Sequence, residues 1–479
     1  MKKIVVSLLA ASLIFSCCAC GGETSGITNS TEKTSSSIKA EETTTGSVQG
    51  EKTWPIIHDE ARIDKTPTIE ETTLVDEDGV KIVATSIEYS SYSVDIAIRI
   101  ENSTDSDLSV YSDTMSAGPN YVNDFSIYDG YLSCDVAAGK TAEDVMSFGN
   151  SELLIHGIDQ IAKFELSFYI DQDLTTAIEN SDFDALAESE ERYYFNCELD
   201  TSVIDSFVFD PDAYSKAIQQ RGDLEGYEVV YFSNEPAFTY DSFDVLSQCI
   251  VKSEDEYIAF IEVHNKYQEP VLVSSNDIYL NGLGVCGGCW SSEKLAAGKY
   301  GVLSINLSSV MKNRFQEAYG VNDFKTLSLS VDVEDADYNP LIEDVEVTVN
   351  LDNSADVDTS GEELYNSDGI RVIDKGLAGP SSEYDSGFYW LLEIENTSDK
   401  EIYISVDDYQ NELTINDIST DGYGDCESKG HDIIALIVNL PYAKDDMNLN
   451  STDDITSIVA CIELEYEEDT NTITLNYNK

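Results

Sequence analysis

Three stretches of the sequence share one pattern: IENSTDSDLSV at 100–110, VHNKYQEPVLV at 263–273 and IENTSDKEIYISV at 394–406. In each stretch an apolar residue stands two places before an asparagine, a polar run follows, and alternating aliphatic residues then resume. Alternation of this kind indicates β-strands, and asparagine before a polar run is typical of a tight turn. We assign a structural turn role to these asparagines, which are Asn102, Asn265 and Asn396.

The spacing after each asparagine extends the repeat over a whole domain. An alternating segment (FELSFYI, LSLSVDV or IVACIEL) begins 62 residues after each asparagine, since 164 − 102, 327 − 265 and 458 − 396 agree. Turn signals separate about seven short strands in each copy. The chain is also too long for a single core. We therefore predict an all-β protein with a tandem array of three immunoglobulin-like β-sandwich domains.

Two further local signals lie inside the copies. The dipeptides Asp129-Gly130, Asn281-Gly282 and Asn416-Asp417 are typical of turns, and we expect them to form equivalent corners of the three domains. The segment 211–220 opens with a proline and is followed by Gly222, which predicts a connector helix. This is the only clear helix that the sequence predicts.

The first residues have the composition of a lipoprotein signal. Two lysines precede an apolar run over 4–15, which is too short to cross a bilayer, and cysteines follow at once. The segment Leu13-Ile14-Phe15-Ser16 favours lipid attachment at Cys17, with Cys20 as the alternative acceptor. An ordinary secretory peptide is the competing interpretation. We predict an extracellular chain, lipid-anchored on the outer face of the cytoplasmic membrane.

The domain organisation follows from these signals. Residues 1–16 are the predicted signal peptide, and residues 17–67 are rich in Ser, Thr and Glu and too poor in apolar side chains to fold. We expect that segment to be a disordered tether. The three predicted β-sandwich repeats are 68–222, which includes the helical connector, 223–354 and 355–479.

The charge balance limits the partners. The chain has 92 acidic and 27 basic residues, so its formal net charge is −65. Such a surface repels nucleic acids and anionic lipid head groups, which leaves the N-terminal lipid as the only expected membrane contact. High acidity also keeps an extracellular protein soluble, and we prefer this interpretation to a specific cationic partner.

Motifs for catalysis are missing from the sequence. There is no Gly-x-Ser-x-Gly elbow, no phosphate-binding loop and no His-Glu-x-x-His, and the four histidines fall at non-equivalent positions of the copies. We therefore predict no catalytic residues, no cofactor and no enzymatic activity. The alternative is a cell-envelope hydrolase with an unrecognised acidic site, because a pair of catalytic carboxylates could not be distinguished in so acidic a chain.

One segment carries a weak calcium-binding pattern. Oxygen-bearing side chains stand at positions 1, 3, 5 and 12 of an EF-hand-like loop that begins at Asp335. Position 6 is Pro340 rather than the glycine that the sharp turn needs, and strands flank the segment. We interpret it as a hairpin connection and predict no metal site. The four candidate ligands are Asp335, Asp337, Asn339 and Glu346.

Seven cysteines follow the signal region, distributed two, three and two over the copies. This distribution permits one disulfide inside each domain, with one thiol left over. Cys286-Gly-Gly-Cys289 has the spacing of a redox pair but lacks the strand-to-helix setting that lowers a thiol pKa. A small loop bridge, or reduced buried thiols, is the interpretation that we prefer.

The segments IENSTDSDLSV, IENTSDKEIYISV, DIYLNG, AAGK and GIDQIAKFELSFYI resemble those of secreted Firmicutes lipoproteins built from repeated immunoglobulin-like domains of unassigned function. The resemblance covers about 70–479 and rests on turns and core strands, so it implies a fold and surface anchoring but no catalytic residues. We expect a non-catalytic surface protein that binds a protein or a glycan.

Overall fold

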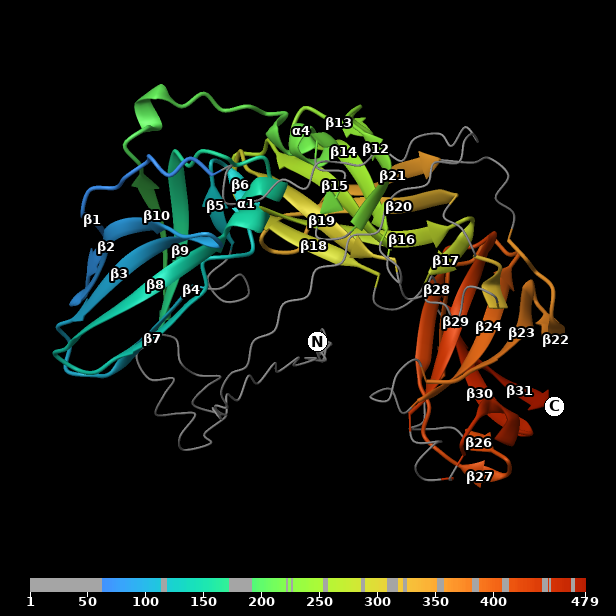
Figure 1. Ribbon diagram of the computed structural model, residues 1–479. Helices are drawn as coiled ribbons and strands as arrows, with labels where there is room; N and C mark the ends of the chain where they lie inside the picture. The colour runs from blue at the N-terminus through green and yellow to red at the C-terminus, as the bar shows by residue number, and fades with distance from the viewer. Residues whose placement is uncertain are drawn as a thin grey trace, which may run out of the picture. The chain divides into compact units, whose positions relative to one another are not determined.

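The computed structural model describes residues 63–479 apart from internal gaps (Figure 1). The predicted signal peptide, the lipid acceptors Cys17 and Cys20 and most of the predicted tether lie outside the described residues. Residues Trp54–Lys479 form one compact unit. The internal gaps are 113–118, 172–191, 221–222, 225–226, 253–256, 286–288, 308–317, 322–324, 351–356, 381–386, 407–412, 442–446, 448 and 467–469.

The first repeat is a succession of short strands. Alternating apolar residues build its longest strands, as in SVDIAIRIEN of β3, where every second side chain is buried. The strands are β1 (Thr72–Glu77), β2 (Val80–Tyr89), β3 (Ser93–Asn102), β4 (Leu108–Ser112), β5 (Asn120–Val122), β6 (Phe125–Ile127), β7 (Leu132–Val136), β8 (Thr141–Gly149), β9 (Lys163–Asp171) and β10 (Arg192–Asp200).

Helical segments are short. The predicted connector contains α4 (Ala213–Gln220). Helix α1 (Asn150–Ile155) was not predicted, because its six residues are too few to give a helical period. Two single 3₁₀ turns are η2 (Ile204–Ser206) and η3 (Thr452–Asp454).

The second and third repeats follow the same order of strands. The second contains β11 (Asp223–Leu224), β12 (Tyr227–Ser233), β13 (Phe238–Thr239), β14 (Phe243–Lys252), β15 (Tyr257–Asn265), β16 (Val271–Leu280), β17 (Leu283–Val285), β18 (Ser291–Leu295), β19 (Tyr300–Asn306), β20 (Thr326–Glu334) and β21 (Pro340–Asn350). The third contains β22 (Glu362–Ser367), β23 (Ile370–Ala378), β24 (Phe388–Asn396), β25 (Ile402–Val406), β26 (Thr414–Ile415), β27 (Ile418–Ser419), β28 (Gly424–Ser428), β29 (Asp432–Leu440), β30 (Ser457–Glu465) and β31 (Thr470–Asn478).

The pairing of strands is repeated three times. One sheet has the order β1-β2-β3-β8 in the first repeat, and the corresponding orders later are β12-β14-β15-β19 and β22-β23-β24-β29. A second set of pairings runs β10-β9-β4-β7, then β21-β20-β16-β18, then β31-β30-β25-β28. The chain is therefore all-β with several sheets, in an arrangement consistent with tandem β domains.

The register of the strands agrees with the spacing in the sequence. Asn102 lies opposite Val80, Asn265 opposite Phe243 and Asn396 opposite Ile370. The strands that the 62-residue spacing predicts, β9, β20 and β30, each begin one residue before the predicted apolar position. Register is held this firmly because a shift of one residue would turn every buried side chain toward water.

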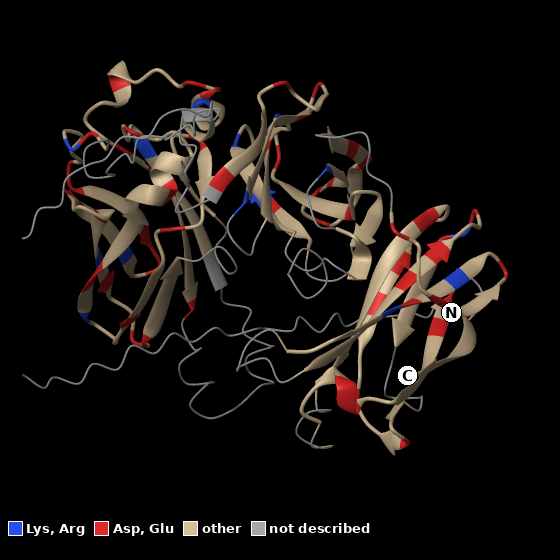
Figure 2. Ribbon diagram, turned by 45° about the vertical axis from the view of Figure 1, so that its right-hand side comes forward, with Lys and Arg blue, Asp and Glu red and all other residues tan. Residues whose placement is uncertain are grey.

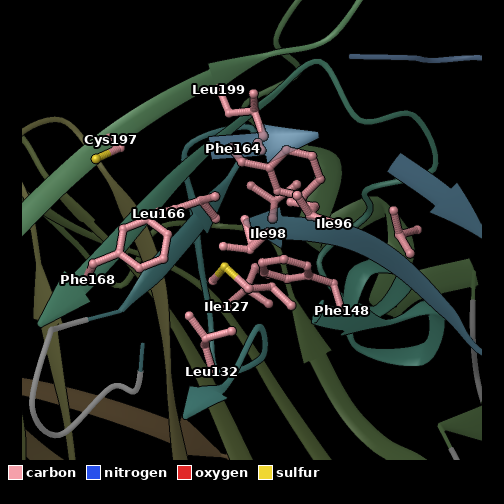
Figure 3. Close-up of a cluster of buried hydrophobic side chains, with 14 of the residues drawn as sticks. Ile96, Ile98, Ile127, Leu132, Phe148, Phe164, Leu166, Phe168, Cys197 and Leu199 are labelled. Atoms are coloured by element: carbon pink, nitrogen blue, oxygen red, sulfur yellow. The ribbon is translucent and has the colours of Figure 1, made fainter. Parts of the chain in front are cut away.

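Apolar side chains from both sheets of a repeat meet in a shared core. Figure 3 shows Ile96 and Ile98 of β3 and Phe148 of β8 close to Phe164 and Leu166 of β9. Two further clusters fill the second and third repeats, and Trp390 is fully buried in the last of them. Burial of these faces is the main force that holds each pair of sheets together.

Two details differ from the sequence prediction. The first repeat has ten strands among its described residues, whereas about seven were expected, because the loops also form short hairpins. The corner equivalent to Asn281-Gly282 and Asn416-Asp417 is Asn123-Asp124, between β5 and β6, and not Asp129-Gly130. Gly130 does adopt a positive φ of 81°, but it follows this hairpin.

Candidate functional site

A groove lined by carboxylates lies where β16 and β17 of the second repeat meet β28 and β29 of the third. Its volume is about 320 Å³, and an adjacent hollow of about 450 Å³ shares four of its lining residues, Asp277, Tyr279, Asp344 and Lys429. Figure 1 shows β17 beside β28 and β29, and β17 pairs in parallel with β29. The charged residues that line the groove are Asp277, Asp332, Asp344, Asp425, Glu427 and Lys429.

Two irregularities of the second repeat bring its carboxylates together. The register between β16 and β20 shifts after Asn276, where Asp277 has a positive φ of 46°. The register between β20 and β21 shifts around Asp332, and Asp344 on β21 has a positive φ of 57°. The Asp344 backbone N–H donates to Asp332 at 2.7 Å. β-Bulges redirect side chains in this way, so these acids gather although they lie on three different strands.

One lysine stands among these acids. Lys429 Nζ lies 2.5 Å from Glu401 Oε1, 3.2 Å from Glu427 Oε1 and 4.0 Å from Asp277 Oδ1. The groove of 320 Å³ has five carboxylates against this one ammonium group, so its formal charge is −5 + 1 = −4 when all groups are ionised. Lys429 therefore neutralises only a small part of the site.

The carboxyl groups in and beside the groove have pKa values that are shifted in different directions. Burial raises the pKa of Asp277, and the nearby Lys429 opposes this rise. Burial and then the Glu401 carboxylate raise the pKa of Glu427, whereas the hydrogen bond from Lys429 lowers the pKa of Glu401. A raised carboxyl pKa means that the charged form lacks compensation, which an additional cation would supply.

Two tyrosines border the charged residues. Tyr279 donates a hydrogen bond to Asp432 Oδ2 at 2.9 Å, which fixes its ring at the edge of the groove. Tyr403 on β25 exposes 41% of its surface, and burial together with Asp425 raises its pKa to about 12. An exposed aromatic ring beside carboxylates can bind a guanidinium, an ammonium or a sugar face. The arrangement is chemically suited to a ligand with positive charge.

The predicted turn asparagines are buried in all three repeats and make equivalent hydrogen bonds. Each Nδ2 donates to the carbonyl oxygen four residues later, at 2.8 Å for Asn102, 3.0 Å for Asn265 and 2.9 Å for Asn396. Each Oδ1 accepts from the backbone N–H two residues later at 2.9 Å. The structure places these residues inside the repeats, and none of the three lines the groove.

A second set of asparagines was only partly found from the sequence. Asn123, Asn281 and Asn416 have φ values of 49°, 53° and 52° at the first position of a two-residue hairpin turn. Each Oδ1 accepts from the backbone N–H groups next to the start of β9, β20 or β30. Asn123 was missed because its distance from the first asparagine is 21 residues, against 16 and 20 in the other repeats.

The weak calcium candidates are divided between a turn and a strand. Asp335 Oδ1 accepts from the backbone N–H groups of Asp337 and Asn339, each at 2.9 Å, so this carboxylate closes the turn between β20 and β21. Glu346 lies on β21 opposite Ser330 and accepts from Thr348. Across the described residues, no group of three or more His, Cys, Asp or Glu is placed to hold a metal ion.

The cysteines and histidines give no shared site in the described part of the chain. Cys134 and Cys197, the two cysteines of the first repeat, are buried free thiols, so the disulfide that the sequence permitted there is not formed. Cys286 lies outside the described residues. His156 packs against Phe125, and His264 stacks on Tyr300 at 3.9 Å between ring centroids. His431 pairs with Asp399 at 2.6 Å in the third repeat.

Comparison with known proteins gives little guidance. No protein-family model and no curated protein matches the sequence. Among solved structures, a bacterial ice-binding adhesin studied for host cell surface retention matches 81% of this chain and 90% of its own, at 11% identity and a TM-score of 0.13. The BSP domain of a biofilm-associated protein matches 87% and 82%, at 8% identity and a TM-score of 0.13.

An enzyme also appears among these structures. The exo-chitosanase of Amycolatopsis orientalis matches 47% of this chain and 26% of its own, at 11% identity and a TM-score of 0.14. At these TM-scores the likenesses show neither a common fold nor a common function. Among the described helices, none has the length and hydropathy of a transmembrane span.

Proposed function

We propose that this chain is a lipid-anchored extracellular protein whose immunoglobulin-like β-sandwich domains bind a partner without catalysis. In this proposal Cys17, or else Cys20, attaches the chain to the outer face of the cytoplasmic membrane. Two sheets around an apolar core in each repeat support the domain type. The strongly acidic composition supports an absence of nucleic-acid partners.

The observation that carries the binding proposal is the −4 formal charge of the groove between the second and third repeats. A cationic ligand would stabilise the charged forms of Asp277 and Glu427, whose pKa values are raised by burial. Acidic residues are spread over all three repeats, as the red segments of the ribbon in Figure 2 show, and at the groove they are combined with a hollow that Tyr279 and Tyr403 also line. We therefore favour a basic segment of a protein partner, with a glycan that carries amino groups as the second ligand class.

Binding can be measured by calorimetry with the unit Trp54–Lys479, which contains every described element and all three cores. The probes are arginine-rich and lysine-rich peptides, a glucosamine oligosaccharide and a neutral oligosaccharide. We expect the affinity for the cationic probes to fall as the salt concentration rises. Asp344→Asn and Asp425→Asn should each lower the affinity about fivefold, which is the size of effect expected for an exposed ion pair. Asp337→Asn, in the turn before β21, is the matched control. Binding that all three substitutions leave unchanged would contradict the groove as the site.

A hydrolase is the alternative function. Glu401 and Glu427 share Lys429, and their pKa values move in opposite directions, which is the relation expected of a catalytic base and acid. The same glycans and peptides are therefore also incubated with the protein and analysed for products. Turnover that Glu427→Gln abolishes would replace the binding proposal by the enzymatic one.

A further inference from the structure

The first and second repeats are joined by a parallel contact between a hairpin and a strand edge. The hairpin β5–β6 of the first repeat reaches β19 of the second, where Phe125 pairs with Tyr300. The Tyr300 backbone N–H donates to the Asp124 carbonyl oxygen at 3.0 Å. The Lys299 ammonium lies 2.6 Å from Asp124 Oδ1. We name this contact the first junction.

The second and third repeats are joined by the same elements, in what we name the second junction. The hairpin β16–β17 reaches β29, and Gly284 pairs with Ile434 and Val285 with Ala435. Both junctions have one register. Tyr300 follows Lys299, whose carbonyl oxygen accepts from the backbone N–H of Asn265, and Ile433 follows Asp432, which pairs with Asn396. Because Gly284 pairs with Ile434, the preceding residue Leu283 lies opposite Ile433. Phe125 lies opposite Tyr300 in the same way.

The equivalent hairpin of the third repeat and the equivalent edge strand of the first repeat have no partner repeat within the described chain. The hairpin β26–β27 of the third repeat pairs only with itself and β30, and Ile418 on it exposes 54% of its surface. The equivalent residues Phe125 and Leu283 expose 1% each because the next repeat covers them. At the other end, β8 is the outer strand of its sheet and pairs only with β3.

The charged residues of the first junction recur on these open elements. Lys140 occupies the position of Lys299, because the carbonyl oxygen of Lys140 accepts from the backbone N–H of Asn102 at 2.8 Å and that of Lys299 accepts from the backbone N–H of Asn265 at 2.9 Å. Asp417 occupies the position of Asp124, the second residue of the hairpin turn, with φ values of 66° and 73°. Lys140 and Asp417 are exposed, and neither forms an ion pair among the described residues. An open hairpin with an acid and an open edge with a base are complementary.

We propose that the partner of both open elements is a second copy of this chain, joined head to tail. The hairpin β26–β27 of one copy would pair in parallel with β8 of the next, with Ile418 opposite Thr141 and Asp417 beside Lys140. Such a contact continues the two junctions already present in the chain. Because the two surfaces differ, the association is heterologous and produces an open series or a closed ring. The inference does not depend on the ligand of the acidic groove.

The experiment measures self-association by sedimentation of Trp54–Lys479 over a wide concentration range. Salt close to the physiological level is used because it screens the long-range repulsion between two strongly acidic copies. The wild-type protein is expected to form assemblies larger than a monomer as concentration rises. A monomer at every concentration would overturn the proposal.

Two charge reversals then test the register. Asp417→Lys and Lys140→Asp each place two like charges at the contact, and each variant alone is expected to associate at least about tenfold more weakly than the wild type. A mixture of the two variants places opposite charges at every contact, so association is expected to return. Asp337→Lys, an equal charge change on an exposed turn, should associate like the wild type.

The mixture of the Asp417→Lys and Lys140→Asp variants distinguishes the head-to-tail contact from other modes of self-association. Self-association that persists in both single variants, or that the mixture fails to restore, would overturn the head-to-tail contact. The substituted side chains are exposed, so the variants should remain folded, with a small fall in the thermal unfolding midpoint of Asp417→Lys because of the positive φ of 66° at that position. A single cooperative unfolding transition in each variant excludes loss of folding as the cause.

Discussion

The side chain of Asn265 donates a hydrogen bond of 3.1 Å to the carbonyl oxygen of Leu295, which lies 30 residues later in the chain. The same Nδ2 also reaches the carbonyl oxygens of Glu269 and Ala296, each at 3.0 Å. Asn265 and Leu295 are both fully buried, so the bond between them is shielded from water. One amide thus connects the turn after β15 to the end of β18.

Asn265→Ala is expected to lower the free energy of unfolding by about 1 to 3 kcal/mol, because the buried carbonyl group of Leu295 loses its donor and the turn loses the hydrogen bonds of the amide. Urea unfolding followed by circular dichroism measures the change. Asn366→Ala on the exposed face of β22 is the control, with an expected effect within about 0.5 kcal/mol. Equal effects of the two substitutions would contradict the structural role of the buried amide.

Glu293 predicts a pH dependence of stability. It is buried at the first junction, where Ser126 and Tyr128 donate to its two carboxylate oxygens. Burial raises its pKa from 4.5 to about 7. Between these values the folded form binds more protons than the unfolded form, so the free energy of unfolding falls as pH rises through this range, by on the order of 3 kcal/mol.

Unfolding in urea at a series of pH values checks this prediction. Glu293→Gln should flatten the decline between about pH 4.5 and 7, whereas Glu143→Gln on the exposed face of β8 should not. A slope remains in the Gln variant because Glu262 also has its pKa raised to about 7 by burial. An unchanged slope would show that Glu293 ionises equally in both states.

Gly157 is expected to be intolerant of a side chain. It has a φ of 74°, and a Cβ there would lie 2.3 Å from the carbonyl oxygen of Ala213 at the start of α4. Gly139 has a φ of 65° and open space around it, so it is a matched control for the backbone conformation. Gly139→Ala should cost about 1 to 2 kcal/mol and Gly157→Ala about 1 to 3 kcal/mol more. Thermal unfolding measures both, and equal losses would contradict the close contact with α4.

Lipid attachment is predicted at Cys17. Expression of the full chain in a host that processes lipoproteins should give an N-terminal diacylglyceryl cysteine, detected by mass spectrometry of the mature N-terminus. Cys17→Ala should release the protein from the membrane fraction or move the modification to Cys20. An unmodified terminus on the secreted wild-type protein would exclude a lipid anchor.

The sequence alone determined the period of the fold. Alternation and the asparagine turns are local signals, because a strand buries every second side chain and a turn asparagine bonds to residues two and four places away. The strands and the register of Asn102, Asn265 and Asn396 were therefore predictable. Asn123 was not, because the loops in front of the second hairpin differ in length and Asp129-Gly130 carried a stronger local signal.

Only the tertiary structure decided which charges meet. In a chain with 92 acidic residues, the position of one carboxylate in the sequence carries almost no information. Asp277 and Asp344 gather because of bulges, and Lys429 reaches Asp277 from another repeat. Glu293 occupies the position on β18 that Cys134 and Cys426 hold on β7 and β28, and Glu293 accepts hydrogen bonds from the hydroxyl groups of Ser126 and Tyr128 in the preceding repeat. Such contacts depend on how the repeats are joined, whereas the turns depend only on residues close in the chain.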